Sequence, residues 1–144
     1  MTISQKGIDL IKKFETFVDH IYICPAGKPT IGYGHVVLNS DSFPVKISQK
    51  EADTLLHIDV QQFIRLVHKQ VKVPLTQGQF DALVCFSFNT GCIGKTMLKK
   101  LNNKDYPGCA EEFDKWVFAT VKGEKIKLSG LIVRRKAEKE LFLS

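Results

Sequence analysis

The residues between Glu15 and His35 carry most of the side chains that could do chemistry. Glu15 ends a segment with helical apolar spacing, and "YICPAGKPTIGYGH" (residues 22–35) adds Cys24, Thr30 and His35 in a stretch rich in glycine and proline. A carboxyl, a thiol, a hydroxyl and an imidazole can each move a proton or hold a water molecule. We therefore take this stretch as the first candidate for a functional site.

Glu15 has two interpretations. At 100° per residue it falls beside Ile8 and Ile11, on the edge of the apolar face of its helix. A carboxylate is costly to remove from water, so a glutamate there needs either a partner or a chemical role. It is either a residue at the solvent edge or paired with an arginine, or a general acid whose pKa is raised by apolar neighbours.

Cys24 is open to several interpretations from spacing alone. With His35 it could form a nucleophile and base pair, and with His20 and His35 it could bind a metal ion. Neither spacing is specific, and no third group that would orient the histidine is evident. The other cysteines, Cys85, Cys92 and Cys109, lie in apolar stretches with helical spacing and are predicted to be small buried residues. No two cysteines form a CxxC pair, which disfavours a zinc ribbon or a thioredoxin motif.

The "TIGYGH" segment suggests a strand and turn with an unusual surface. Gly32 and Gly34 alternate, so one face of this segment lacks side chains. Another part of the molecule or a ligand can then approach the backbone closely. The two interpretations are tight packing under a helix and a groove in which an extended ligand lies against the strand.

The elements that must hold these residues follow from apolar periodicity and capping patterns. A helix over about 2–17 is expected, with a capping box of Thr2 and Gln5, followed by a small β region. Ser48 and Glu51 form a second capping box, which opens a long helix over about 48–70. These elements place Glu15 at the junction between the first helix and the β region.

The remainder of the chain is predicted to be mainly helical. Thr76 and Gln79 form a third capping box, and the segment after them is apolar almost all round, which predicts a central buried helix ending at Gly91. Further helices are expected over about 95–102, 109–119 and 131–142, with a polar turn or hairpin before the last. The fold class is therefore α+β, mainly α.

Composition indicates one globular domain with a basic surface. The chain has 144 residues, 44% of them apolar, and a formal net charge of +6. No apolar run reaches the roughly 18 residues of a membrane span, and the first residues lack the pattern of a signal peptide. The positive charge suits an anionic partner, whether nucleic acid, anionic lipid or an acidic cell-wall polymer, or serves solubility alone.

Several segments together resemble a known family, the phage-type lysozymes or T4-lysozyme-like endolysins (glycoside hydrolase family 24). The segments, in order, are "GIDLIKKFE", "YICPAGKPTIGYGH", "VPLTQGQFDALVCFSFNTG", "MLKKLN", "EEFDKW" and "GLIVRR". The resemblance covers nearly the whole chain. It implies a single lysozyme-like catalytic domain over 1–144 with two lobes: a small β-hairpin lobe (about 18–47) and a helical lobe (about 74–144 with the helix 2–17). The helix of about 48–70 would connect them.

The resemblance also implies an activity and catalytic residues. The activity is hydrolysis of the β-1,4 bond between N-acetylmuramic acid and N-acetylglucosamine in bacterial peptidoglycan, without a cofactor or metal. The family's catalytic Glu and Thr match Glu15 and Thr30. Cys24 occupies the position of the family's catalytic Asp, which is a departure that some relatives share. Whether Cys24 would act as a base, as a nucleophile or only to position water stays open, and so does inversion or retention.

Other residues are assigned supporting roles by the same resemblance. Val36 and Phe88 are expected to contact the sugar. His35 matches a histidine that looks structural in relatives. Arg134 or Arg135 matches a basic residue that looks like a partner for the catalytic glutamate, and the sequence does not decide between them.

Three other functions are compatible with the sequence. A lytic transglycosylase would cleave the same bond with one glutamate and leave a 1,6-anhydro product, and loss of the aspartate favours it. A catalytically inactive cell-wall binder would keep the substrate and lose the chemistry. A nucleic-acid-binding protein has the charge in its favour but no recognisable motif.

Partners and location follow from the resemblance. The expected partner is the glycan strand of peptidoglycan, with no nucleic acid and no stable membrane insertion, and the protein is expected to be a monomer. A phage endolysin of this kind would stay in the host cytoplasm until a holin-like permeabiliser releases it to the cell wall for host cell lysis. The basic charge would suit an acidic wall.

Overall fold

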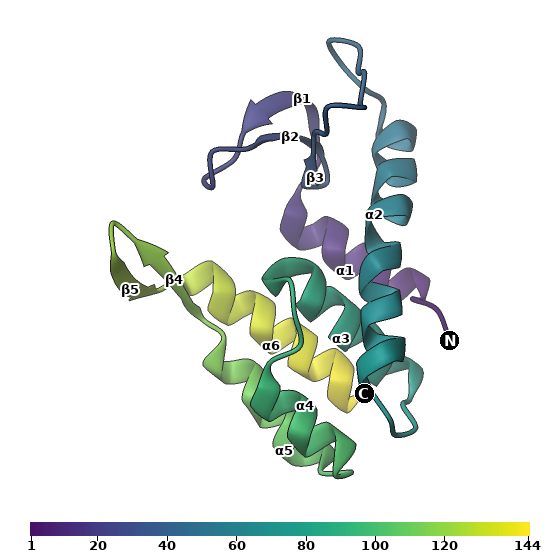
Figure 1. Ribbon diagram of the computed structural model, residues 1–144, viewed down its shortest axis with the longest axis vertical. Coiled ribbons are helices and arrows are strands. Elements are labelled where there is room, and N and C mark those ends of the chain that lie inside the picture. Colours follow the sequence, from purple (N-terminus) through teal and green to yellow (C-terminus); the bar gives the residue numbers. More distant parts are fainter. The chain divides into compact units, whose positions relative to one another are not determined.

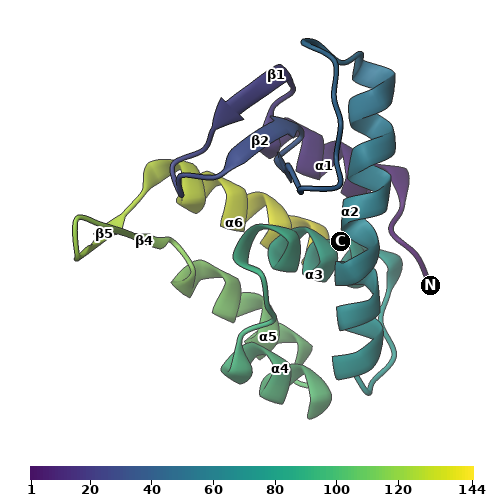
Figure 2. The same cartoon turned by 45° about the horizontal axis from the view of Figure 1, so that its top comes forward.

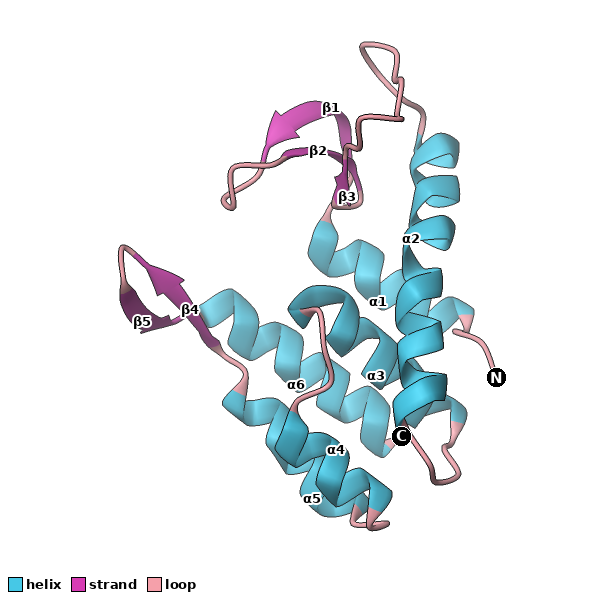
Figure 3. Cartoon of the chain, viewed as in Figure 1, coloured by secondary structure: helices cyan, strands magenta, loops and turns pink.

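The computed structural model describes residues 1–144 and is mainly helical (Figure 1). Figure 3 distinguishes its helices, two small antiparallel sheets and loops. None of the helices combines the length and apolar character needed to cross a membrane. The predicted α+β, mainly α class is confirmed. The elements are α1 (Gln5–Glu15), β1 (Val18–Ile23), β2 (Pro29–Gly32), β3 (His35–Val36), α2 (Gln49–Gln70), α3 (Gln77–Thr90), α4 (Lys95–Asn102), α5 (Tyr106–Glu112), a 3₁₀ helix (Phe113–Lys115), β4 (Phe118–Val121), β5 (Glu124–Lys127) and α6 (Ser129–Leu143).

The chain divides into two compact units. The first, which we call the sheet unit, is Asp9–Gln62 and contains β1, β2 and β3. The second, the helical unit, consists of Met1–Ile8 and Phe63–Ser144. The boundaries fall within α1 and α2, so each of these helices contributes residues to both units.

The sheet unit is built on an antiparallel sheet in the order β1-β2-β3. Figure 2 shows β1 and β2 side by side. Pro29 is the first residue of β2, where its missing N–H does least harm to the ladder. Lys12 links α1 to α2 and to Tyr33 within this unit. Its Nζ lies 2.8 Å from Oδ1 of Asp53 in α2 and 5.5 Å from the ring centroid of Tyr33.

A buried histidine links β3 to α2 within the same unit. Nδ1 of His35 lies 2.7 Å from Oδ2 of Asp59, and Nε2 lies 3.0 Å from Oδ2 of Asp41. Burial alone would lower the pKa of His35, but the hydrogen bonds to the two carboxylates outweigh it and raise that pKa. The Leu38 N–H and then His35 lower the pKa of Asp41. At Asp59, burial raises the carboxyl pKa more than His35 lowers it.

The helical unit is organised around α3, as the apolar sequence of this helix predicts. Eight consecutive residues of α3, from Phe80 to Ser87, are buried. α6 packs along α3, and the two helices approach closely where Gly78 faces Leu141: a Cβ on Gly78 would lie 2.5 Å from the Leu141 carbonyl oxygen. α4 packs against α5, and the 3₁₀ helix packs against α6.

Two predicted capping boxes and one predicted helix end are confirmed. At α2 the Ser48 hydroxyl accepts the Glu51 N–H at 3.1 Å, and the Glu51 carboxylate accepts the Ser48 N–H at 3.2 Å. At α3 Thr76 and Gln79 exchange the same pair of hydrogen bonds. Gly91 ends α3 with a left-handed φ of 86°.

The prediction for the first helix was wrong at both ends. α1 begins at Gln5, because the Ser4 N–H donates to Oδ1 of Asp81 at 2.9 Å and holds the preceding chain outside the helix. It ends at Glu15, because Thr16 has a φ of 59°. The helix expected over 2–17 is therefore Gln5–Glu15, and Thr2 does not cap it.

Two further expectations were wrong in the helical unit. The helix expected over 109–119 is α5, which starts earlier at Tyr106 and gives way to the 3₁₀ helix, because residues from Phe118 onward pair with β5. Cys92, expected to be buried, is exposed, because it follows the turn at Gly91. Cys85 and Cys109 are buried, as predicted.

The His35 cluster predicts pH-dependent stability. The raised pKa of His35 means that its stabilisation is complete below the unfolded value of about 6.5 and is lost as pH rises through the higher folded pKa. The lowered pKa of Asp41 gives a contribution that is present above about 3.9 and lost as pH falls through the folded value. Replacing His35 by Gln should thus cost most between about pH 4 and 6.5, on the order of 1–3 kcal/mol.

Denaturant unfolding of wild type and His35→Gln at a series of pH values measures this cost. His57→Gln is the matched control, since His57 is exposed on α2 and bonds only to a carbonyl of its own helix. The cost of His35→Gln should shrink as pH rises through the folded pKa of His35. A cost that stays constant or grows with pH would contradict the role assigned to His35.

Candidate functional site

Glu15 lies at a sharp junction between α1 and β1. The chain leaves the helix at Thr16, whose left-handed φ of 59° costs a non-glycine residue roughly 1–2 kcal/mol, and β1 starts at Val18. The Glu15 side chain is half-buried. Its carboxylate approaches Gly34, because a Cβ built on Gly34 would lie 3.1 Å from Oε2 of Glu15. The carboxylate therefore lies against the turn that follows β2.

The two alternating glycines have different neighbours. Gly32, with φ of 70°, faces the Ala52 side chain of α2, where an added Cβ would lie at 3.4 Å. This is the tight packing under a helix that was one of the two interpretations. Gly34, with φ of 77°, faces Glu15 instead. At both glycines the atoms that approach the backbone therefore belong to this protein, to Ala52 at Gly32 and to Glu15 at Gly34.

The sheet places Tyr22, Thr30 and Val36 in one row. Its register pairs Tyr22 with Thr30 across β1 and β2, and Thr30 with Val36 across β2 and β3. Directly paired residues project to the same face of a sheet, so these three side chains share one face. Cys24 follows directly after the end of β1. Three of the residues predicted from the sequence, Cys24, Thr30 and Val36, are therefore on neighbouring parts of one small sheet.

Cys24 lies in a turn that favours its thiolate. Its N–H donates to the Lys28 carbonyl oxygen at 3.0 Å, and its carbonyl oxygen accepts the Gly27 N–H at 2.8 Å. Hydrogen bonds from the Lys28 backbone N–H and then from the Thr30 hydroxyl lower the pKa of the Cys24 thiol. A thiolate is thus more populated at neutral pH than for an ordinary cysteine.

The Thr30 hydroxyl is held by the same turn. Its side chain is buried, and Oγ1 donates to the Lys28 carbonyl oxygen at 2.9 Å. Lys28 is also the residue whose carbonyl oxygen accepts the Cys24 N–H at 3.0 Å. Thr30 and Cys24 are therefore both anchored to the backbone of Lys28.

Tyr22 belongs to this site, and the sequence analysis missed it. Burial raises the pKa of the Tyr22 phenol, and the negative charges of Cys24 and Glu15 raise it further. The side chains of Glu15 and Cys24 are therefore both electrostatic neighbours of Tyr22. The signal was present in the sequence, because Tyr22 lies two residues before Cys24 and residues two apart in a strand share a face.

The structure argues against the two sequence interpretations of Cys24 that use histidine. Both ring nitrogens of His35 bond to carboxylates, so His35 has no nitrogen left to activate a thiol. His20 is exposed and bonds to Asp19 at 2.9 Å. No group of three or more His, Cys, Asp or Glu side chains is arranged to hold a metal ion. Cys24 with His20 and His35 is therefore not such a group.

The predicted arginines lie buried on α6 in the helical unit. Nε of Arg134 lies 3.2 Å from Oε2 of Glu138, and Nε of Arg135 lies 3.0 Å from Oε1 of the same residue. Arg135 also donates to Oδ1 of Asn89 and borders a hollow of about 310 Å³. Which arginine pairs with Glu15 stays a prediction.

The two residues expected to contact sugar belong to different units. Val36 is 41% exposed on β3, so its side chain is accessible. Phe88 of α3 is half-buried and packs edge-on against Phe63, with ring centroids 5.6 Å apart. Their sugar contacts stay predictions.

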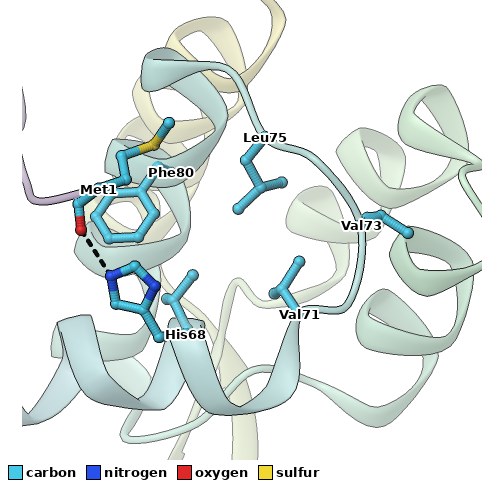
Figure 4. A pocket seen from close by; sticks show the side chains of 7 residues that line it. Met1, His68, Val71, Val73, Leu75 and Phe80 are labelled. Atoms are coloured by element: carbon cyan, nitrogen blue, oxygen red, sulfur yellow. Dashed lines mark hydrogen bonds between the residues drawn. The ribbon is translucent and has the colours of Figure 1, made fainter.

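A separate apolar pocket lies in the helical unit (Figure 4). Its volume is about 150 Å³, and Nε2 of His68 bonds to the Met1 carbonyl oxygen at 2.6 Å beside it. None of the residues predicted to act in the site borders this pocket. Its lining is Met1, Val67, His68, Val71, Val73, Leu75 and Phe80.

Comparison with known proteins gives one consistent result. The family model described as "Phage lysozyme" matches residues 12–138. The endolysin of Acyrthosiphon pisum secondary endosymbiont phage 1 is 45% identical over 100% of this chain and 99% of that protein. The endolysin of Bacillus phage B103 is 44% identical over 100% of this chain, which spans 55% of that longer protein. The solved endolysin from Escherichia coli O157:H7 phage FAHEc1 has a TM-score of 0.91 and 39% identity, covering 100% of this chain and 94% of that one.

The fold and these likenesses define a lysozyme-class hydrolase, a muramidase of the endolysin type. The chain belongs to the phage lysozyme family. The family, the fold class and the enzyme class expected from the sequence are thus confirmed.

The contact between Glu15 and Gly34 predicts a sharp effect of a single methyl group. Gly34→Ala would put a Cβ 3.1 Å from the Glu15 carboxylate at a φ of 77°. It should lower the free energy of unfolding by about 1–2 kcal/mol through backbone strain. By displacing the carboxylate it should also lower lytic activity by roughly tenfold to a hundredfold.

Gly123→Ala is the matched control for the backbone cost. Gly123 has a φ of 81° and no atom within 4 Å of an added Cβ. It should lose similar stability, measured by denaturant unfolding, and keep its rate of cell-wall lysis. Equal rates for the two variants would show that the approach to Glu15 does not matter.

Proposed function

We propose that this protein hydrolyses the β-1,4 bond between N-acetylmuramic acid and N-acetylglucosamine in peptidoglycan, with Glu15 as general acid and Cys24 in place of the usual aspartate. The observation that carries the proposal is the surroundings of Tyr22, which has both the Glu15 carboxylate and the Cys24 sulfur as electrostatic neighbours in one unit. A pair of ionisable groups, one to donate and one to accept a proton, is what glycoside hydrolysis needs.

Glu15 supplies the proton in this mechanism. As the C1–O bond of the muramic acid unit breaks, the leaving oxygen takes the carboxyl proton and Glu15 becomes a carboxylate. The position of Glu15 against Gly34 supports this role, because a close neighbour on one side limits the directions in which the carboxyl group can point.

Cys24 accepts a proton in the form we favour. A water molecule held near Thr30 attacks C1 from the opposite face, and its proton moves to the Cys24 thiolate, which inverts the anomeric configuration. The lowered pKa of Cys24 supports the thiolate as a base. Two other roles are distinguishable by experiment. A nucleophilic sulfur would form a covalent glycosyl intermediate and retain configuration, and a thiol that only positions water would work at a reduced rate.

The rival readings concern the same bond. A lytic transglycosylase would use Glu15 alone and form a 1,6-anhydro product without water, and the replacement of aspartate by Cys24 is the observation in its favour. An inactive cell-wall binder would give no product. Release by a holin-like partner, a monomeric state and residence in the host cytoplasm before release accompany the hydrolase proposal as further expectations.

Glu15→Gln separates these functions. The amide keeps the shape of the carboxyl group but cannot supply a proton, so lysis of purified peptidoglycan should fall by roughly 10²–10⁴-fold. Mass spectrometry of the wild-type muropeptides should show products with one water added. Anhydro products would assign the transglycosylase, and wild-type lysis by the folded Gln variant would remove Glu15 from the mechanism.

Thiol modification tests the role of Cys24. Cys24 and Cys92 are the accessible thiols, whereas Cys85 and Cys109 are buried, and burial raises the pKa of Cys109 to about 12. In a Cys92→Ser background a thiol-blocking reagent should therefore modify Cys24 and stop lysis. The same background without the reagent should lyse normally, which is the control.

Replacement of the sulfur then separates its possible roles. Cys24→Asp should stay active, resist the reagent and move the rising limb of the pH–rate profile to lower pH, because a carboxyl group ionises below a thiol. Cys24→Ala should lose roughly 10²–10⁴-fold. A well-folded but inactive Asp variant would argue for nucleophilic sulfur, and undiminished lysis by blocked enzyme would place Cys24 outside the reaction.

A further inference from the structure

One hollow of the helical unit has no assigned role in the hydrolysis. Its volume is about 430 Å³, and three chain segments border it: the start of α4, the 3₁₀ helix with the residue after it, and the β4–β5 hairpin. α4 and this hairpin, both labelled in Figure 1, belong to the helical unit. The side chains that matter here are Lys95, Glu112, Lys115, Trp116, Phe118 and Lys125.

Trp116 and Phe118 form an aromatic wall of this hollow. The Trp116 ring packs directly on Gly94, where an added Cβ would be 2.6 Å from Cζ2 of the indole. Only glycine at position 94 leaves space for the ring in this position. The indole also packs edge-on against Phe86, with centroids 5.3 Å apart. Phe118 is 45% exposed beside it. The packed Trp116 ring can accept an apolar or C–H surface without first being ordered, and the exposed Phe118 ring extends that surface.

The charged groups of the hollow are mainly positive. Lys95, Lys115 and Lys125 stand against a single carboxylate, that of Glu112. Glu112 is buried and lies 2.5 Å from Nζ of Lys115, whose hydrogen bond holds the carboxyl pKa below its usual range. Glu112 therefore stays ionised and orients Lys115.

Two of these lysines are available to a ligand. No carboxylate lies within ion-pair distance of Lys95 or Lys125, and both side chains are exposed. Nζ of Lys125 lies over the Phe118 ring, 5.5 Å from its centroid, which places the ammonium group next to the aromatic wall. An ammonium group adjacent to an aromatic face suits an anionic group carried on an apolar or C–H-rich backbone.

We propose that this hollow binds a carboxylate or phosphate group of an anionic cell-wall polymer, with Lys95 and Lys125 contacting the anion and Trp116 and Phe118 contacting the chain that bears it. The identification of the polymer as part of the cell wall rests on the proposed function. The binding of the anionic group does not, since it follows from the residues of this hollow alone. This would be a second binding site for the polymer, separate from the residues that cleave it.

Trp116 makes the proposal directly testable, because it is the only tryptophan of the chain. Its fluorescence is titrated with a short glutamate peptide, with glycerol 3-phosphate and with the matched glutamine peptide at low salt. We expect a saturable change with one or both anions and none with the glutamine peptide. A response to the glutamate peptide alone assigns peptide carboxylates as the source, and a response to glycerol 3-phosphate alone assigns polyol phosphates. The absence of a saturable response to both anions overturns the proposal.

Matched double variants localise the effect. Lys95→Gln/Lys125→Gln should weaken anion binding roughly three- to tenfold. Lys99→Gln/Lys122→Gln removes the same charge from α4 and from the hairpin turn, outside the hollow, and should stay within about twofold of wild type by the same reasoning. Equal weakening in the two variants, or none in the first, would overturn the proposal.

This test is independent of cleavage. The titration is repeated with Glu15→Gln, which should bind the anion as wild type does. If lysis fails but the Trp116 response remains, the proposed function is wrong and the anion site stands. If lysis proceeds but the response is absent, the anion site is wrong and the hydrolase stands.

Discussion

The close approach of the Glu15 carboxylate to the backbone of Gly34 is the constraint on which the sheet unit depends. An added Cβ would lie 3.1 Å from Oε2, so any side chain at position 34 would have to displace the Glu15 carboxylate. The contact also requires α1 to stop at Glu15, so that the side chain projects from a helix end, and Thr16 accepts a left-handed φ of 59° to allow it. A strained non-glycine residue persists only where its surroundings determine it, and strain of this kind is concentrated at functional sites. The junction thus trades stability for the position of one carboxyl group.

Sulfur at position 24 changes what the rest of the site must do. An aspartate would be ionised at neutral pH without help, whereas a thiol with an ordinary pKa would be mostly protonated. The turn from Cys24 to Lys28 provides that help through the Lys28 N–H, and the Thr30 hydroxyl adds a second donor. The Thr30 hydroxyl is itself anchored to this turn, because it donates to the Lys28 carbonyl oxygen at 2.9 Å. The backbone turn therefore moves the thiol toward the acidity that a carboxyl group has intrinsically.

Local patterns predicted the parts of the fold that local chemistry determines. The capping boxes at Ser48 and Thr76 and the left-handed Gly91 require only nearby atoms, and all three were recognisable in the sequence. The start of α1 was not, because Asp81, distant in the chain, takes the Ser4 N–H. The end of α5 was missed for a similar reason, since residues from Phe118 onward pair with β5. In the site, residue types pointed to Glu15, Cys24 and Thr30. The spacing of Tyr22 to Cys24 was visible in the sequence, but its pairing with Thr30 follows only from the strand register.

The locations of the cationic side chains say more about binding than the net charge of the chain does. A net charge of +6 suggests a diffuse attraction to anions, which salt screens over about 8–10 Å. Part of that charge is internal, since Arg134 and Arg135 are buried on α6, each within ion-pair distance of Glu138. Lys95 and Lys125 differ, because they border a hollow with an aromatic wall. There the attraction of the ammonium groups should weaken with salt, while the contact with Trp116 and Phe118 should not, so the two contributions are separable by ionic strength.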